Sequence, residues 1–322
     1  MVCLCGTIVL NHLPSLLDDG RTVSFRNWQR FPATTFFNAI LAYNTFRTLV
    51  ASLCTERAQN AVQLYRTRFA GFLEDADLSY SSDHIQLADF LTAEGVLLRP
   101  VAEEPKYCVA SPLIDALVTL QVIPNQFPIA PSIPVPIILD IPFVLTEALK
   151  CFDKDLIQSA YSFSFKPSKV PVNGSRHTQV PRESIYVTEL KRILCHWLSR
   201  GRWSVIGQWH SKTPDGKHKF SDAVLHKDGN TPIVLEFVAT ADAKVMRAHV
   251  EKTPGYMDLH SADEGWVIHF TCEDGFTPTW QTRDELRRGV NVIHVSHRED
   301  FRNVTLHIYS KDAEKQTRDI CL

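Results

Sequence analysis

A short apolar run with one glutamate in its middle, Pro232–Ala239 (PIVLEFVA), sets the strongest requirement on the fold. The run predicts a β-strand, and its lack of polar alternation is typical of a strand at the centre of a sheet. Burying an unpaired carboxylate costs free energy. Glu236 is therefore expected to lie beside a metal ion, a cation or hydrogen-bond donors.

The segments around this strand alternate between helix and strand. Residues 183–198 have apolar side chains at helical spacing, and residues 241–252 form a second expected helix, closed by Thr253–Gly255. The expected strands are 203–209, 220–226, 232–239, 265–271, 290–295 and 304–309, with a short helix around 282–288. The order α-β-β-β-α-β is that of the PD-(D/E)XK, or restriction-endonuclease-like, fold, which is the fold class expected for residues 183–322.

Two carboxylates fall where this fold keeps its chemistry. Asp222 lies in the second strand and Glu236 in the third, so both can converge on one divalent cation. Magnesium takes oxygen ligands and keeps several waters. The sequence therefore predicts a magnesium site, or a manganese site, at Asp222 and Glu236. Glu189, on the preceding helix, matches a third acidic position that many members of the fold use.

The PD-(D/E)XK pattern has a lysine two residues after the second acidic residue. In this chain Val238 stands at that position. That lysine would neutralise charge in the transition state. Lys219, three residues before Asp222, and Lys252, at the end of the following helix, are the two candidates to replace it. Spacing does not distinguish them, and whether the site still catalyses a reaction stays open.

The first half of the chain is expected to be mainly helical. Residues 85–122 read as helix, strand, turn, strand and helix, which is how a winged-helix module ends. The expected domains are 1–165, a helical and winged-helix region, then an exposed linker at 166–182, rich in proline, and the nuclease-like domain at 183–322. The winged helix predicts either nucleic-acid contact or an adaptor role. Its wing carries as many acidic as basic residues, which favours the adaptor.

The chain resembles Crinkler-type effectors and their fungal relatives. The segments that carry the resemblance in the second half are Val180–Tyr186, 235–241, Thr253–Met257, 264–274 and 290–294. Met1–Gly6 is similar to the lid region after a P-loop ATPase core. The resemblance implies an ATPase, winged-helix and nuclease architecture, but no phosphate-binding loop motif occurs here. It implies DNA in preference to RNA as substrate, a separate P-loop ATPase as partner, and action in the cytoplasm or the nucleus, including the nucleus of a host cell.

Composition excludes several classes of protein. With 34 basic and 36 acidic residues among 322, a globally basic nucleic-acid coat is excluded, although a local basic patch is not. Eight scattered cysteines without a C-x-x-C pair are typical of reduced thiols in an intracellular protein. The longest apolar stretch, 129–149, contains four prolines and an aspartate, so no membrane association is expected.

Three functions remain open from the residues. The first is a magnesium-dependent nuclease in which Asp222 and Glu236 hold the metal, Glu189 assists, and Lys252 or Lys219 stabilises the phosphorane. The second is a catalytically degenerate nuclease-like domain that binds nucleic acid or a protein. The third is an interaction scaffold without nucleic-acid contact.

Overall fold

The computed structural model describes most of the chain, in two compact units, Met1–Gln59 and Asn60–Leu322. The described residues are Leu17–Asp18, Thr22–Val23, 37–70, 76–79, 81–101, 104–212, 218–278, 289–310 and 313–322. Two sequence predictions, the lid-like start Met1–Gly6 and the short helix at 282–288, lie outside these residues.

The first unit contains short elements. Strands β1 (Leu17–Asp18) and β2 (Thr22–Val23) pair antiparallel. They are followed by α3 (Phe37–Leu41), α4 (Asn44–Leu53) and the 3-10 turn η2 (Glu56–Ala58). The helices lie in a region where the apolar spacing predicts helix.

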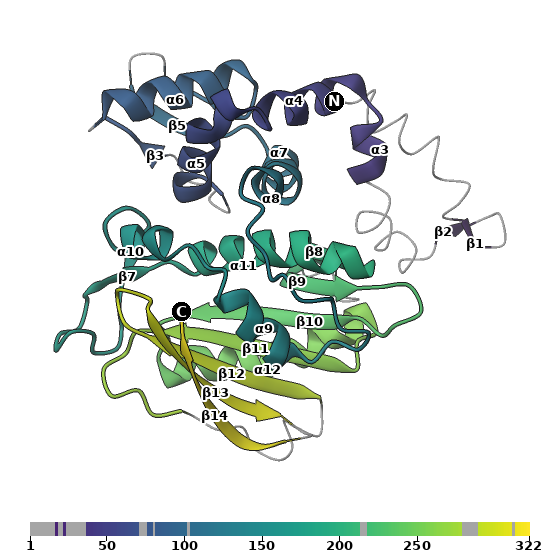
Figure 1. Ribbon diagram of the computed structural model, residues 1–322, viewed down its shortest axis with the longest axis vertical. Helices are drawn as coiled ribbons and strands as arrows, with labels where there is room; N and C mark the ends of the chain where they lie inside the picture. The colour runs from purple at the N-terminus through teal and green to yellow at the C-terminus, as the bar shows by residue number, and fades with distance from the viewer. Residues whose placement is uncertain are drawn as a thin grey trace. The chain divides into compact units, whose positions relative to one another are not determined.

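The second unit is built on a sheet, for which the described residues supply seven strands (Figure 1). The spatial order is β14-β13-β12-β11-β10-β9-β8, with β10–β11 and β11–β12 parallel and the other neighbours antiparallel. The strands are β8 (Ser204–Lys212), β9 (His218–His226), β10 (Ile233–Ala239), β11 (Glu264–Thr271), β12 (Val290–His297), β13 (Asn303–Ser310) and β14 (Ala313–Cys321).

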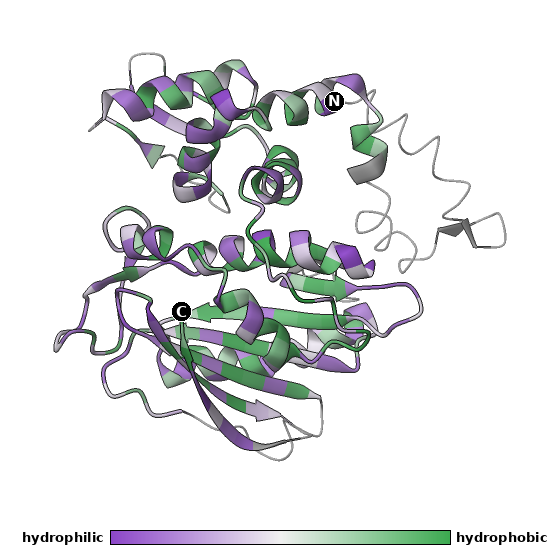
Figure 2. Cartoon of the chain, in the orientation of Figure 1, coloured by the Kyte–Doolittle hydropathy of each residue, from purple (hydrophilic) through white to green (hydrophobic). Residues whose placement is uncertain are grey.

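Strand β10 lies at the centre of this sheet, as its apolar sequence predicts, and all seven of its residues are buried. Ile233, Leu235 and Phe237 pack into one core with helix α11 (Glu183–Leu198). Helix α12 (Ala243–His260) contacts β10 and β11. Figure 1 shows the two helices on opposite faces, and Figure 2 shows that the central strands are largely hydrophobic. Because a helix covers each face of the sheet at β10, polar and apolar residues do not alternate along this strand.

Helix α12 differs from its predicted extent. It continues through Pro254 to His260, whereas the Thr253–Gly255 sequence predicts its end near Lys252. Burial of Tyr256 and Met257 against the sheet continues the helix. The contact is close at Gly265 of β11, where an added Cβ would lie 2.7 Å from the sulfur of Met257. Packing of the last two turns therefore outweighs the helix-breaking preference of proline.

The 3-10 turn η4 (Ser199–Gly201) follows α11, and most of the other elements of the second unit precede it. They include α5 (Gln59–Arg68), β3 (Ala76–Asp77), α6 (Ser82–Ala93), β4 (Leu97–Leu98), β5 (Lys106–Val109), α7 (Pro112–Leu117), the π-helical turn η3 (Val118–Val122), α8 (Ile123–Gln126), α9 (Ile141–Leu149) and α10 (Lys154–Phe163). Ser111 caps α7, because its side chain accepts a hydrogen bond from the Ile114 backbone N–H. No helix among the described residues has the length and apolar character that crossing a membrane requires.

The elements from α6 to α7 follow the order that predicts a winged helix, and that assignment stays a prediction. The basic side chains of the expected wing bind within the module. Lys106 pairs with Glu104 at 2.7 Å, and Arg99 lies 3.7 Å from Asp89. Contacts of this kind occupy charges that a phosphate-binding wing would present to nucleic acid.

The expected linker, 166–182, contains ordered structure. Strands β6 (Phe165–Pro167) and β7 (Gln179–Pro181) pair antiparallel. Val170, Val172 and Val180 are buried in a small cluster with Tyr161 and Cys272. The boundary between the two compact units lies after Gln59 and not at this segment. The prolines that predicted an exposed linker instead flank a hairpin packed onto the sheet domain.

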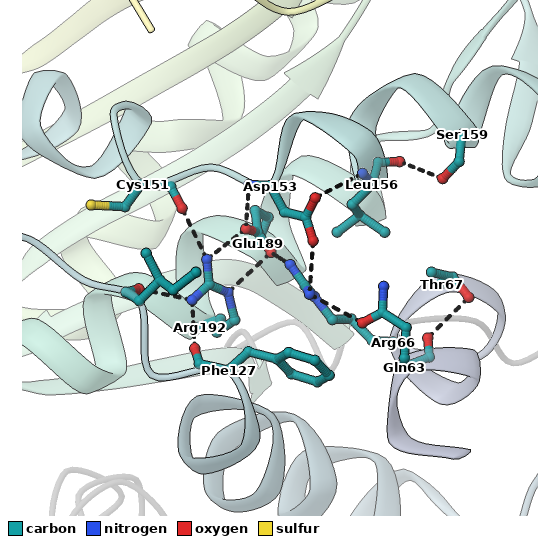
Figure 3. Close-up of polar contacts among 11 residues, drawn as sticks. Gln63, Arg66, Thr67, Phe127, Cys151, Asp153, Leu156, Ser159, Glu189 and Arg192 are labelled. Carbon is teal, nitrogen blue, oxygen red and sulfur yellow. Dashed lines mark hydrogen bonds and ion pairs between the residues drawn. The ribbon is translucent and has the colours of Figure 1, made fainter. Parts of the chain in front are cut away.

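A buried ion-pair network ties α11 to the segments before it (Figure 3). The carboxylate of Glu189, which is 0% exposed, accepts hydrogen bonds from Arg66, from Arg192 at 2.6 and 3.1 Å, and from the Asp153 backbone at 2.9 Å. Arg192 also donates to the carbonyl groups of Phe127, at 2.6 Å, and Cys151, at 3.1 Å. Burial alone raises the pKa of Glu189, but the two guanidinium groups outweigh it and the net shift is downward.

We expect Glu189→Ala to lower the free energy of unfolding by about 3–5 kcal/mol, because it leaves two buried arginines without their shared counter-charge. Urea unfolding followed by circular dichroism measures the change. The matched control is Glu147→Ala, which breaks a pair with the half-exposed Lys150 and should cost about 1 kcal/mol or less. Equal losses in the two variants would contradict the central role of the network.

Candidate active site

The two predicted carboxylates meet where β9 and β10 part. Backbone pairing between these strands covers Ile233–Leu235. Beyond Leu235, carboxylate oxygens accept the hydrogen bonds of backbone N–H groups in place of backbone carbonyl groups. The Phe237 backbone N–H donates to Asp222 Oδ2 at 2.9 Å, and the Asp222 backbone N–H donates to Glu236 Oε1 at 3.3 Å. The local backbone therefore holds both carboxylates in fixed positions.

Glu236 is in a poor environment for a negative charge. It is 0% exposed in the middle of β10. Burial, and next the charge of Asp222, raise the pKa of Glu236 to about 8. Additional positive charge at this point would stabilise the ionised form.

Helix α12 supplies a positive charge. Lys252 Nζ lies 2.8 Å from Glu236 Oε2. Burial lowers the pKa of Lys252, but Glu236 and Asp222 outweigh burial, so the net shift is upward. His249, one turn earlier, has its Nδ1 3.8 Å from the same oxygen. Burial and the nearby lysines lower the pKa of His249 to about 4, so this imidazole is neutral and forms no ion pair at neutral pH.

The position of Lys252 bears on the lysine that is absent at Val238. Val238 is buried in β10, and Lys252 brings an ammonium group to the carboxylate from the next helix. Of the two lysines left open by the sequence, Lys252 therefore lies at the site. The backbone of Lys219 pairs with Ser211 in β8, and its side chain lies outside the described part of the chain.

Glu189 does not join Asp222 and Glu236, which corrects the role expected for it. Its hydrogen-bond partners are Arg66, Arg192 and the Asp153 backbone, as Figure 3 shows. Glu183, six residues earlier on α11, is the carboxylate that faces Asp222. Six residues correspond to about 240° around a helix, so the two glutamates point in different directions.

Three more charged residues lie near the site, and two of them, Glu183 and Lys166, were missed by sequence reasoning. Burial and the charge of Asp222 raise the pKa of Glu183 to about 7. Lys191, on the same helix, is buried, and burial lowers its pKa. Lys166 of β6 donates to the Ala239 carbonyl, and burial lowers its pKa too. Helical spacing could have found Glu183, which lies within about 80° of Lys191 on α11. Lys166 lies in the segment that reads as linker.

Asp222 and Glu236 are the side chains that could hold a magnesium or manganese ion. In the described ranges, no group of three or more His, Cys, Asp or Glu residues is placed to hold a metal. Two carboxylates suffice for magnesium, which is usually bound through one or two carboxylates and keeps several waters. The raised pKa of Glu236 fits this donor set, because burial and the charge of Asp222 raise it and a cation between the two carboxylates would relieve their repulsion.

Comparison with known proteins adds little to this description. No protein-family model matches the chain, and no curated protein sequence does. Among solved structures, the chain is similar to Can2 from Sulfobacillus thermosulfidooxidans in complex with cyclic tetra-adenylate, with 12% sequence identity and a TM-score of 0.23. The match covers 78% of this chain and 52% of that chain, so the chain spans about half the length of Can2.

The pH dependence of stability tests the environment of Glu236. Its pKa rises from 4.5 to about 8 on folding, so the folded state binds more protons between these values. The free energy of unfolding should therefore fall as the pH rises from 4.5 through 8. Glu236→Gln should reduce this slope by up to about 1.4 kcal/mol per pH unit. Urea unfolding between pH 5 and 9 measures it.

The control for this series is Glu251→Gln, an exposed glutamate on the same helix as Lys252. It should leave the slope as in the wild type. A Glu236→Gln slope equal to that of the wild type would contradict a buried, proton-binding Glu236.

Proposed function

We propose that the chain is a metal-dependent nuclease that hydrolyses phosphodiester bonds, with DNA favoured over RNA. The observation that carries the proposal is the ion pair between Lys252 and Glu236, at 2.8 Å, beside Asp222 on the neighbouring strand. Two carboxylates and an ammonium group are the combination that phosphodiester hydrolysis with a divalent cation needs. Here helix α12 supplies the ammonium group that β10 lacks.

Each residue has a distinct role in this proposal. Asp222 and Glu236 would hold the cation, which would supply a more acidic water and stabilise charge on the phosphate. Lys252 places positive charge where the phosphorane oxygens become negative. Glu183, with a pKa of about 7, can take up a proton from the attacking water at neutral pH.

The finer parts of the proposal come from the resemblance to Crinkler-type effectors. That resemblance supports a restriction-endonuclease-like domain preceded by a winged helix, DNA as the substrate, and a separate P-loop ATPase as a partner. The order α11, β8, β9, β10, α12, β11 supports the first of these. Asp222 in β9 and Glu236 in β10 also lie on the second and third strands of this order, where the fold keeps its acidic residues.

A second candidate function, a non-catalytic nuclease-like module, has one observation in its favour. Lys252 already places positive charge beside Glu236, so the carboxylate has a counter-ion without a metal. This module would bind nucleic acid in the presence of a chelator, and it would be insensitive to Glu236→Gln.

Cleavage of labelled single-stranded and duplex DNA in magnesium tests the first proposal. Asp222→Asn and Glu236→Gln should abolish cleavage, and Lys252→Met should lower the rate about 10²–10³-fold. Lys244→Met, an exposed lysine on the same helix, is the matched control and should cleave as the wild type does. Cleavage that survives Glu236→Gln would overturn the assignment.

Magnesium titration by calorimetry separates the two candidate functions. The nuclease should bind magnesium in the wild type and lose that binding in Glu236→Gln. The apparent affinity should rise as the pH increases towards about 8, because the cation displaces the proton of Glu236. DNA binding without any magnesium binding, with or without DNA present, would favour the non-catalytic module.

A further inference from the structure

A cavity of about 150 Å³ lies beside the carboxylate pair. Asp222 and Glu183 line it and also have roles in the proposed hydrolysis, whereas its other lining residues have none. Helix α7 and the turn η3 form one wall, α11 forms another, and β8 and β9 close it. Asp222 belongs to this cavity as well as to the carboxylate pair. A molecule held here would therefore lie next to the site of the chemistry.

Polar groups in the wall lack partners among the described residues. Thr119 Oγ1 and Ser184 Oγ are buried without a hydrogen bond. Lys191 also lines the cavity and is 7% exposed, so its ammonium group can reach a molecule held there. Unsatisfied buried groups cost free energy, and the two hydroxyl groups in the wall of one cavity indicate a ligand that completes their hydrogen bonds.

The charges in the wall restrict what that ligand can be. Asp115, Glu183 and Asp222 face one lysine, Lys191, so an anion such as a free phosphate would be repelled. The carboxylates call for hydrogen-bond donors. Lys191 and the two hydroxyl groups can donate to acceptors. The ligand therefore carries no negative charge, and it fits the wall best with an amino group on one edge and carbonyl or ring-nitrogen acceptors on another.

Size and wall chemistry add a ring to this description. A cavity of about 150 Å³ is known to hold a single six-membered ring. Ala116, Leu120 and Val187 supply apolar surface for the faces of such a ring. Both features fit a pyrimidine base better than a purine.

We propose that this cavity binds a cytosine base of the nucleic-acid substrate, extruded from its stack. The exocyclic amino group donates to the carboxylates, a pairing that proteins use to recognise cytosine. The carbonyl oxygen and the ring nitrogen accept from Lys191 and the hydroxyl groups of Thr119 and Ser184. Thymine would place a carbonyl oxygen where the amino group belongs, against a carboxylate, and is rejected.

The proposal rests on the proposed function for its substrate class, but base recognition does not require catalysis. The test therefore measures binding in a chelator, where no cleavage occurs. The probe is a short, labelled, single-stranded oligodeoxyadenylate that carries one central cytidine. Two further probes carry thymidine or an abasic nucleotide at that position. Fluorescence anisotropy at one fixed salt concentration gives the dissociation constants, because phosphate contacts depend on salt.

The cytidine probe should bind about tenfold more tightly than the thymidine or abasic probe. The double substitution Thr119→Val with Ser184→Ala should reduce that ratio towards one without changing the affinity for the abasic probe. Thr305→Val, on the distant strand β13, is the matched control and should keep the ratio.

A second variant protects the test against misfolding. Gly207 lines the cavity from β8, and an added Cβ would lie 2.6 Å from Lys191 Nζ, at the flexible end of that side chain. Gly207→Val should therefore fill the cavity and remove the cytidine preference while the melting temperature shows a folded protein.

Equal affinity for the three probes, no binding of any probe, or a preference that survives the cavity variants would overturn the proposal. A cytidine preference in a protein that never cleaves DNA would contradict the proposed nuclease activity and leave the base pocket supported. Cleavage without a base preference would contradict the base pocket and leave the nuclease activity supported.

Discussion

One buried carboxylate, Glu189, determines how helix α11 is held. Two guanidinium groups and a backbone N–H converge on it, from Arg66, Arg192 and Asp153. Removing this carboxylate would leave two buried guanidinium groups without their shared counter-charge in a place that water does not reach. The network therefore requires segments far apart in the sequence to pack together, all of them within the compact unit of residues 60–322.

The orientation imposed by Glu189 determines what α11 presents on its other side. With Glu189 directed at the arginines, Glu183 and Lys191 are directed at the cavity beside Asp222. The stacked contact of Tyr186 with Phe270, at 4.4 Å between ring centroids, holds the same helix against the sheet. A structural ion pair and a candidate functional surface thus depend on one rotation of one helix, and a change in the first would displace the second.

The sequence predicts the part of the site that local patterns encode. An apolar run with a glutamate in its middle predicts a central strand, and the spacing to Asp222 predicts a carboxylate on the neighbouring strand. The role of Glu189 could not be predicted, because its partner Arg66 lies 123 residues away and the helical pattern has several polar positions. The hairpin at 165–181 was missed for a similar reason. Its prolines indicate exposure locally, whereas burial of Val170 and Val180 depends on contacts with distant residues.

Asp222 links the two sites proposed for this protein. Its Oδ2 is held by the Phe237 backbone, so the side chain cannot turn fully to one site and leave the other. A base that donates to this carboxylate and a cation bound by it share one fixed group. Binding at the two positions is therefore energetically coupled, and the coupling free energy is the same in both directions. The coupling favours binding of both ligands only if the base and the cation use different oxygens of Asp222. In that arrangement, hydrolysis would depend on which base lies beside the scissile phosphate.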